Sequence, residues 1–198
     1  MKTDDKKVIV TIGRQVGSGG RIVGEMLAKR LEVPFYDKRI LEMASKESGI
    51  KGEFFERIDE NFSPFRQIIT SGISDVSMFQ EQSNAILKAA EQGGAVFVGR
   101  CSDYILRNNT NVVNVFLTAE MSDRIARAME YFKISEQEAS KLIREHEKNR
   151  SKYYSFFTDK TWGDAASYHL CLNTSLVGLE ATVDIIINYI NSFMHNSL

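Results

Sequence analysis

A short apolar segment that runs straight into a glycine cluster constrains this chain most. Residues 8–12 read VIVTI, and the glycine-rich segment 13–20 follows at once. After the glycines, apolar residues recur at helical spacing until Pro34. This pattern predicts a buried strand, a loop and a helix, which together form the first unit of a parallel α/β sheet. A ligand of such a sheet binds beyond the carboxyl ends of the strands.

Four further segments have the near-continuous apolar character of strands that are covered on both faces: residues 33–36, 95–98, 112–117 and 168–172. Helical patterns fill most of the chain between and after them. We expect a helical insert over residues 41–92, a densely charged helical segment over 122–154 and an amphipathic helix over 176–190. The order predicts an α/β fold with a parallel sheet of about five strands, within a single domain over residues 1–198.

The glycine cluster has the features of a phosphate site. Glycines between a strand and a helix let backbone N–H groups approach an anion, and the helix N-terminus adds a partial positive charge. The strict pattern G-x-x-x-x-G-K-[ST] is not met, because Gly20 stands at the lysine position and Arg21 at the Ser/Thr position. Arg14 replaces the leading glycine. Arg21 or Arg14 could supply the missing positive charge, since a guanidinium pairs with phosphate oxygens.

A dinucleotide-binding oxidoreductase is an alternative interpretation of the same loop. Thr11, Gly13, Gly17 and Gly19 match a T-G-x-x-x-G-x-G loop in spacing, and Asp37 lies about 20 residues on, where a ribose-binding acid is expected. Against it, no tyrosine of the chain is followed four residues later by lysine, as the catalytic pair of short-chain dehydrogenases requires.

Composition excludes other classes of protein. The 198 residues carry a net charge of −1, which argues against nucleic acid as a partner. The two cysteines have no disulfide or zinc spacing, and the charged N-terminus precedes an apolar run too short for a signal sequence or a membrane span. We therefore expect a cytoplasmic protein without a membrane partner.

Together with the glycine loop, several stretches resemble the cytidylate kinase-like family, a divergent branch of the P-loop nucleoside monophosphate kinases. One of them is Val98-Gly99-Arg100-Cys101, in which Cys101 stands where cytidylate kinase has aspartate. The matching stretches are residues 12–21 with 34–38, residues 98–106, residues 115–119 with Arg124 and Arg127, and residues 148–154 with 162–164 and 172–175.

The resemblance implies a three-layer P-loop nucleotide kinase fold with helices on both faces of the sheet. It also implies transfer of the ATP γ-phosphoryl group to a nucleoside monophosphate, with CMP or dCMP as first choice. Residues 41–92 would then be an acceptor-binding insert, and residues 141–164 a basic lid. The cofactors would be ATP and Mg2+, with the metal held mainly by phosphates and water rather than by side chains.

The resemblance also implies roles for individual residues. For ATP binding these are Gly13, Arg14, Gly17, Ser18, Gly19, Gly20, Arg21, Arg124, Arg127, Asn173 and Thr174. For acceptor binding they are Asp37, Arg39, Arg100, Asp103 and Lys152, and for catalysis Arg21, Lys148 and Arg150.

Four questions stay open at this point. The missing lysine is compatible with a regulatory module that binds nucleotide and has lost the chemistry. The basic run at residues 148–152 is also typical of a solvated helix face, and Asp37 of a helix N-cap. The phenylalanine-rich insert could form an acceptor-binding lobe or the surface of a homodimer.

Overall fold

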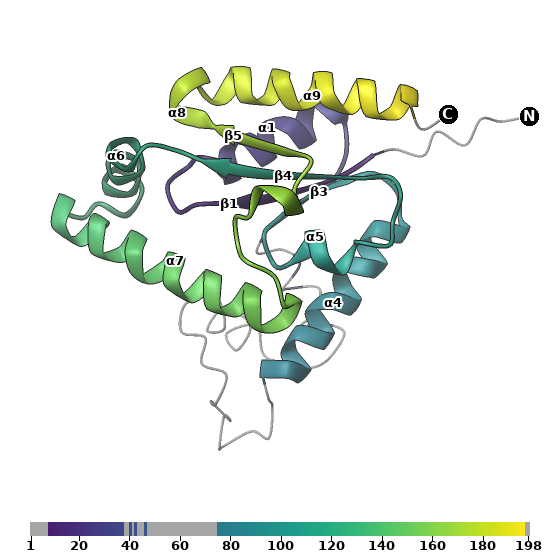
Figure 1. The fold of residues 1–198 in the computed structure, drawn as a ribbon, viewed down its shortest axis with the longest axis horizontal. Helices are drawn as coiled ribbons and strands as arrows, with labels where there is room; N and C mark the ends of the chain where they lie inside the picture. The colour runs from purple at the N-terminus through teal and green to yellow at the C-terminus, as the bar shows by residue number, and fades with distance from the viewer. Residues whose placement is uncertain (1–7, 38–39, 41, 43–45, 47–74, 197–198) are drawn as a thin grey trace, which may run out of the picture.

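The computed structural model describes residues 8–37, 40, 42, 46 and 75–196. Within them the chain forms one parallel sheet of five strands in the order β2-β3-β1-β4-β5 (Figure 1). Every predicted strand is present. The strands are β1 (Ile9–Arg14), β2 (Phe35–Tyr36), β3 (Ala95–Val98), β4 (Val112–Thr118) and β5 (Leu170–Asn173).

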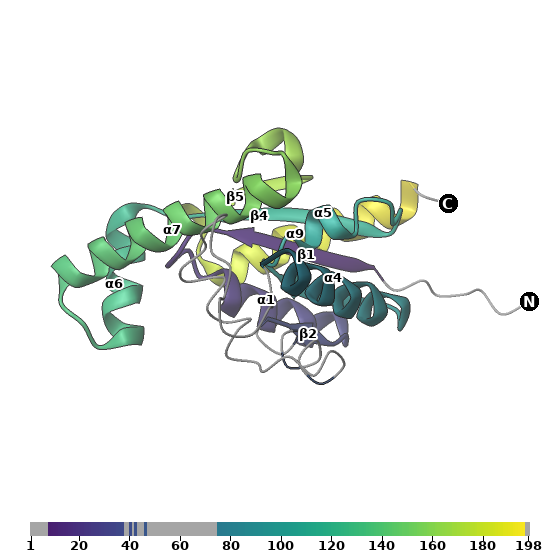
Figure 2. The same cartoon turned by 90° about the horizontal axis from the view of Figure 1, so that it is seen from below.

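Successive residues of the central strands face two different cores, as the period of a strand requires. Val10 and Ile12 of β1 pack toward α1 (Gly20–Leu31) and α9 (Leu179–Asn196). Ile9 of β1 and Phe97 of β3 pack on the other face, toward α4 (Asp75–Glu91), α5 (Ser102–Ile105) and α7 (Glu136–Thr158). Figures 1 and 2 show the sheet between these two sets of helices, which confirms the predicted three-layer α/β fold.

Two helical segments differ from the prediction because each consists of two helices. Residues 122–154 form α6 (Met121–Phe132) and α7, separated by Lys133 in a left-handed conformation and by Ser135, which caps α7. The C-terminal segment begins with the short helix α8 (Thr174–Val177) and turns at Gly178 into α9. A 3-10 turn, η1 (Ala165–Ser167), precedes β5.

The strand order decides between the two interpretations of the glycine loop. In the dinucleotide-binding fold the order is 3-2-1-4-5-6, so that the second strand lies next to the first. Here β3 lies between β1 and β2. The oxidoreductase alternative is therefore not supported.

Part of the predicted insert lies outside the described residues. Helix α4 confirms that the C-terminal part of the insert is helical. Residues 47–74, and Arg39 just before the insert, lie outside the described residues. In the described part of the chain, no helix is both long and apolar enough to cross a membrane.

Candidate active site

The loop between β1 and α1 follows a tight path against helix α6. Gly17 and Gly19 have left-handed φ angles of 78° and 81°. A methyl group on Gly17 would lie 2.6 Å from the backbone oxygen of Arg124 and 2.8 Å from its Cα. Glycine is thus required at this position both for its conformation and for the close approach of α6.

Side chains from α6 hold the carbonyl groups of this loop. The Nε atom of Arg124 donates a hydrogen bond to the Val16 carbonyl at 2.8 Å, and Nη1 of Arg127 donates to the Gly17 carbonyl at 3.0 Å. Because C=O and N–H of a trans peptide point in opposite directions, the N–H groups of Gly17 and Ser18 point away from these arginine side chains. The N–H of Ser18 donates to the Gln15 carbonyl at 3.3 Å. The N–H of Gly17 has the orientation with which glycine-rich loops bind phosphate.

The end of the loop is held from the other side of the site. The hydroxyl of Thr174, at the start of α8, donates to the Ser18 carbonyl at 2.8 Å. The hydroxyl of Ser18 itself donates to the Gln15 carbonyl at 2.9 Å, and Ser18 is fully buried. Asn173 lies next to Thr174, and its amide donates to Glu120 at 3.0 Å. The predicted ATP-binding residues of β5, α6 and α8 therefore surround the loop.

Arg124 is a buried cation with a half-buried partner. Its residue is 3% exposed, and Nη2 lies 2.5 Å from a carboxylate oxygen of Glu147 on α7. A charge at this depth requires such a partner, because an unpaired buried charge is strongly destabilising. Arg124 consequently joins the glycine loop to α7. Contact with the adenine stays a prediction for Arg124 and Arg127.

Arg14 extends across the carboxyl edge of the sheet. A methyl group on Gly20 would lie 2.7 Å from Cβ of Arg14, and one on Gly99 would lie 1.8 Å from Nη1. The side chain therefore passes over the backbone of both glycines, from the end of β1 toward the end of β3. Nη1 of Arg150 on α7 donates to the Arg14 carbonyl at 3.4 Å. The guanidinium of Arg14 thus lies between the glycine loop and the segment that carries Arg100.

Arg21 occupies a different environment, at the edge of α1. Its side chain is half-exposed, and Nε lies 3.0 Å from Glu25 and 3.7 Å from Asp37. The hydrogen bond to Glu25 and the charge of Asp37 raise the pKa of Arg21 above its usual value. Two nearby carboxylates compete with phosphate for this guanidinium. Of the two arginines proposed for the role of the lysine, Arg14 is the one directed along the strand ends.

The turn after β3 carries two of the predicted acceptor-binding residues. Arg100 is buried, and Asp103 follows at the start of α5. The hydroxyl of Tyr154 on α7 donates to Oδ2 of Asp103 at 2.6 Å. Burial raises the pKa of the Asp103 carboxyl above its usual value, although the hydrogen bond from Tyr154 lowers it. Asp103 therefore binds α7 in this structure, and its contact with an acceptor base stays a prediction.

The remaining predicted residues lie on α7 and β1. Lys148 and Lys152 are exposed, whereas Arg150 is half-buried. All three belong to one continuous helix of 23 residues, so the predicted lid begins within α7. A methyl group on Gly13 would lie 2.7 Å from the ring of Phe116, so packing against β4 explains this glycine.

Gln15 and Glu147 were missed by the sequence analysis. Oε1 of Gln15 accepts a hydrogen bond from the backbone N–H of Ala119 at 3.3 Å, and Glu147 neutralises Arg124. The sequence feature that could have indicated them is their position: Gln15 lies inside the glycine loop, and Glu147 lies within the basic segment of α7.

The half-buried carboxyl of Asp103 predicts a measurable pH dependence. Since its folded pKa is raised, the folded protein binds this proton more tightly than the unfolded chain, and stability falls as the pH rises through that interval. Asp103→Asn removes the charge and keeps an oxygen that accepts from Tyr154. We expect the melting temperature of the variant to exceed that of the wild type at neutral pH. The difference should vanish below about pH 4, the usual range of the carboxyl; a difference that is constant with pH contradicts the assignment.

The model of the cytidylate kinase-like family matches residues 9–176. The chain belongs to this family. A cytidylate kinase from Methanopyrus kandleri is 24% identical over 188 residues, which covers 90% of this chain and 91% of that protein. Among solved structures, an uncharacterized protein from Eubacterium ventriosum is similar with a TM-score of 0.76 and 28% identity, covering 94% of this chain and 99% of that one.

A gluconokinase from Sinorhizobium meliloti shares the fold, with a TM-score of 0.61 and 13% identity over 96% of this chain and 95% of its own. Membership of the cytidylate kinase-like family and this fold together support a nucleotide-dependent kinase. Kinases of such a family generally use ATP and Mg2+. Within the described residues, no group of three or more His, Cys, Asp or Glu side chains could hold a metal ion.

Proposed function

We propose that this protein transfers the γ-phosphoryl group of ATP to a nucleoside monophosphate, with CMP or dCMP as the first candidate. The observation that carries the proposal is the glycine loop, whose carbonyls are bound by Arg124, Arg127 and Thr174. Because these carbonyls are bound from the side of α6 and α8, the N–H groups of Gly17 and Gly19 would bind an anion at the carboxyl edge of the parallel sheet, where ligands of such sheets bind. The N–H of Ser18 donates to the Gln15 carbonyl within the loop. Family membership and the cytidylate kinase relative support the choice of acceptor.

In the proposed reaction, a phosphate oxygen of the acceptor attacks the γ-phosphorus of ATP. The bond from that phosphorus to the β,γ-bridging oxygen breaks, and ADP leaves with the electron pair. Catalysis of this kind consists mainly of positioning and of neutralising charge on phosphate oxygens. The loop N–H groups would hold the ATP phosphates, and Arg14 would neutralise the transferring group. Arg100 would hold the acceptor phosphate.

Further basic residues complete the proposed site. Arg150, which reaches the Arg14 carbonyl, would act on the transferring group together with Lys148 on the same helix. Lys152 and Asp37 would contact the acceptor side, and Arg39 belongs to this proposal by sequence alone. Mg2+ would arrive with ATP and offset the charge of its phosphates, held mainly by phosphate oxygens and water.

The test is ADP release from ATP-Mg by the purified protein, alone and with CMP, dCMP, UMP, AMP and GMP in turn. The proposal predicts ADP release that depends on an acceptor, together with the matching nucleoside diphosphate. If ATP raises the melting temperature but no acceptor yields a diphosphate, the kinase proposal is wrong. That result would favour the regulatory module that binds nucleotide without turnover.

A further inference from the structure

The turn that follows β3 is held in an unfavourable backbone conformation. Gly99, Arg100 and Cys101 have successive φ angles of 76°, 62° and 54°. The left-handed region costs a non-glycine residue about 1–2 kcal/mol, so Arg100 and Cys101 need support from their surroundings. Such strained turns occur at functional sites, and this one carries the arginine that we propose for the acceptor phosphate.

One buried side chain supplies that support. Gln82 of α4 is 2% exposed, and its amide nitrogen lies 3.2 Å from the Arg100 carbonyl. The same nitrogen lies 3.2 Å from the hydroxyl oxygen of Tyr153 on α7. A carboxamide has two N–H donors, so one amide serves both acceptors. Gln82 thus joins the strained turn to α7.

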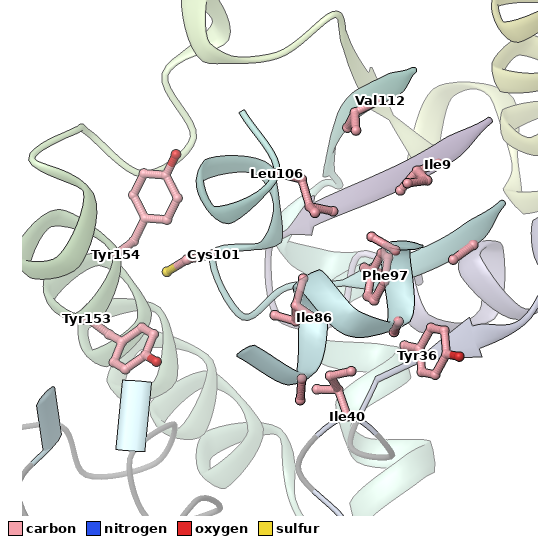
Figure 3. Close-up of a cluster of buried hydrophobic side chains, with 14 of the residues drawn as sticks. Ile9, Tyr36, Ile40, Ile86, Phe97, Cys101, Leu106, Val112, Tyr153 and Tyr154 are labelled. Carbon is pink, nitrogen blue, oxygen red and sulfur yellow. The ribbon is translucent and has the colours of Figure 1, made fainter. Parts of the chain in front are cut away.

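Helix α7 connects this bridge to the rest of the site. Tyr153 is buried and lies one helical turn after Arg150, whose guanidinium donates to the Arg14 carbonyl. In Figure 3, Tyr153 and Tyr154 of α7 lie on the same side of the hydrophobic cluster as Cys101 of the turn. The contacts therefore run from Arg100 through Gln82 and α7 to the end of β1.

We propose that Gln82 is a positioning residue for phosphoryl transfer. Its amide holds the Arg100 turn and helix α7 in fixed relation, so that the arginine for the acceptor phosphate and the basic residues for the transferring group face the same space. This inference rests on the proposed function. It adds a residue of α4 that contacts the Arg100 turn and α7 and belongs to neither the glycine loop nor the basic helix.

The test compares Gln82→Leu with Gln80→Leu, the same change at an exposed position of the same helix. Gln82→Leu removes both hydrogen bonds of the bridge. Because displacing reacting groups by about 1 Å costs up to about 100-fold, we expect the acceptor KM to rise and kcat to fall by about 10-fold each. The Kd for ATP should change less than twofold. Gln80→Leu should leave all three values at those of the wild type.

A merely structural role predicts a different pattern. A smaller folded fraction lowers the apparent kcat and leaves both KM values unchanged. If Gln82→Leu lowers kcat without changing either KM, the positioning role is overturned. If Gln82→Leu does not fold, Tyr153→Phe removes a single hydroxyl from the bridge and should shift the acceptor KM in the same direction. Tyr153→Phe kinetics equal to the wild type would then overturn the inference.

The wild type separates this inference from the function beneath it. A wild-type protein that forms no nucleoside diphosphate from any acceptor overturns the proposed function, and the role of Gln82 with it. An active wild type with a Gln82→Leu variant that matches Gln80→Leu overturns the role of Gln82 alone.

Discussion

Arg14→Ala should lower kcat/KM for phosphoryl transfer by about 100-fold or more, the usual effect of removing one group that stabilises transition-state charge. The P-loop lysine is absent, and the Arg14 side chain passes over Gly20 and Gly99 into the space between the glycine loop and the Arg100 turn. Arg14→Lys keeps the charge but loses the guanidinium fork, so its kcat/KM should lie between that of the wild type and that of Arg14→Ala. Steady-state kinetics with ATP and the best acceptor measure both variants.

Arg21→Ala is the matched control for this prediction. Its guanidinium is half-exposed and already engaged with Glu25 and Asp37, so we expect a loss of only a few-fold. The melting temperatures of both variants should be compared with that of the wild type, to separate chemistry from folding. A large loss for Arg21→Ala with a small loss for Arg14→Ala would assign the role of the lysine to Arg21 instead.

Gly17→Ala should have the largest effect on stability. The added methyl group would meet backbone atoms of Arg124 at 2.6 and 2.8 Å, and a backbone of helix α6 moves less easily than a side chain. Gly19→Ala is the matched control, because Gly19 is left-handed with φ 81° and ψ 7°, and the added methyl group would meet only the end of the Leu179 side chain, which can rotate away. The conformational strain common to both sites is about 1–2 kcal/mol.

Thermal unfolding separates the clash from the strain. For a chain of this size 1 kcal/mol corresponds to about 2–4 °C, so Gly19→Ala should lower the melting temperature by about 2–8 °C. Gly17→Ala should lower it at least twice as much and abolish the stabilisation by ATP. An equal decrease in melting temperature for the two variants would contradict the close contact between Gly17 and the backbone of α6.

The sequence was sufficient to predict the sheet. Each strand was recognised because its apolar run is short and because glycine, proline or polar residues bound it, as at Gly13 and Pro34. The break between α6 and α7 was missed, although Ser135 and Glu138 form the S-x-x-E pattern of a capping box. Continuous charge and helical spacing on both sides concealed that local signal.

The site was predictable only as a set of residue types. Glycines between strand and helix indicate a phosphate loop, but the sequence does not show that Arg124 and Arg127 bind its carbonyls, since that depends on how closely α6 packs against Gly17. Gln82 gave a weaker signal. It is a polar residue on the buried face of α4, and its two acceptors come from distant parts of the chain.

The most direct test of the central claim follows the γ-phosphorus itself. Phosphorus NMR of ATP-Mg with CMP should show, on adding the wild-type protein, loss of the γ signal of ATP and growth of the signals of ADP and CDP in equal amounts. With Arg14→Ala the same signals should grow at about a hundredth of the rate. Release of inorganic phosphate without CDP or any other nucleoside diphosphate, across the acceptors tested, would contradict the account.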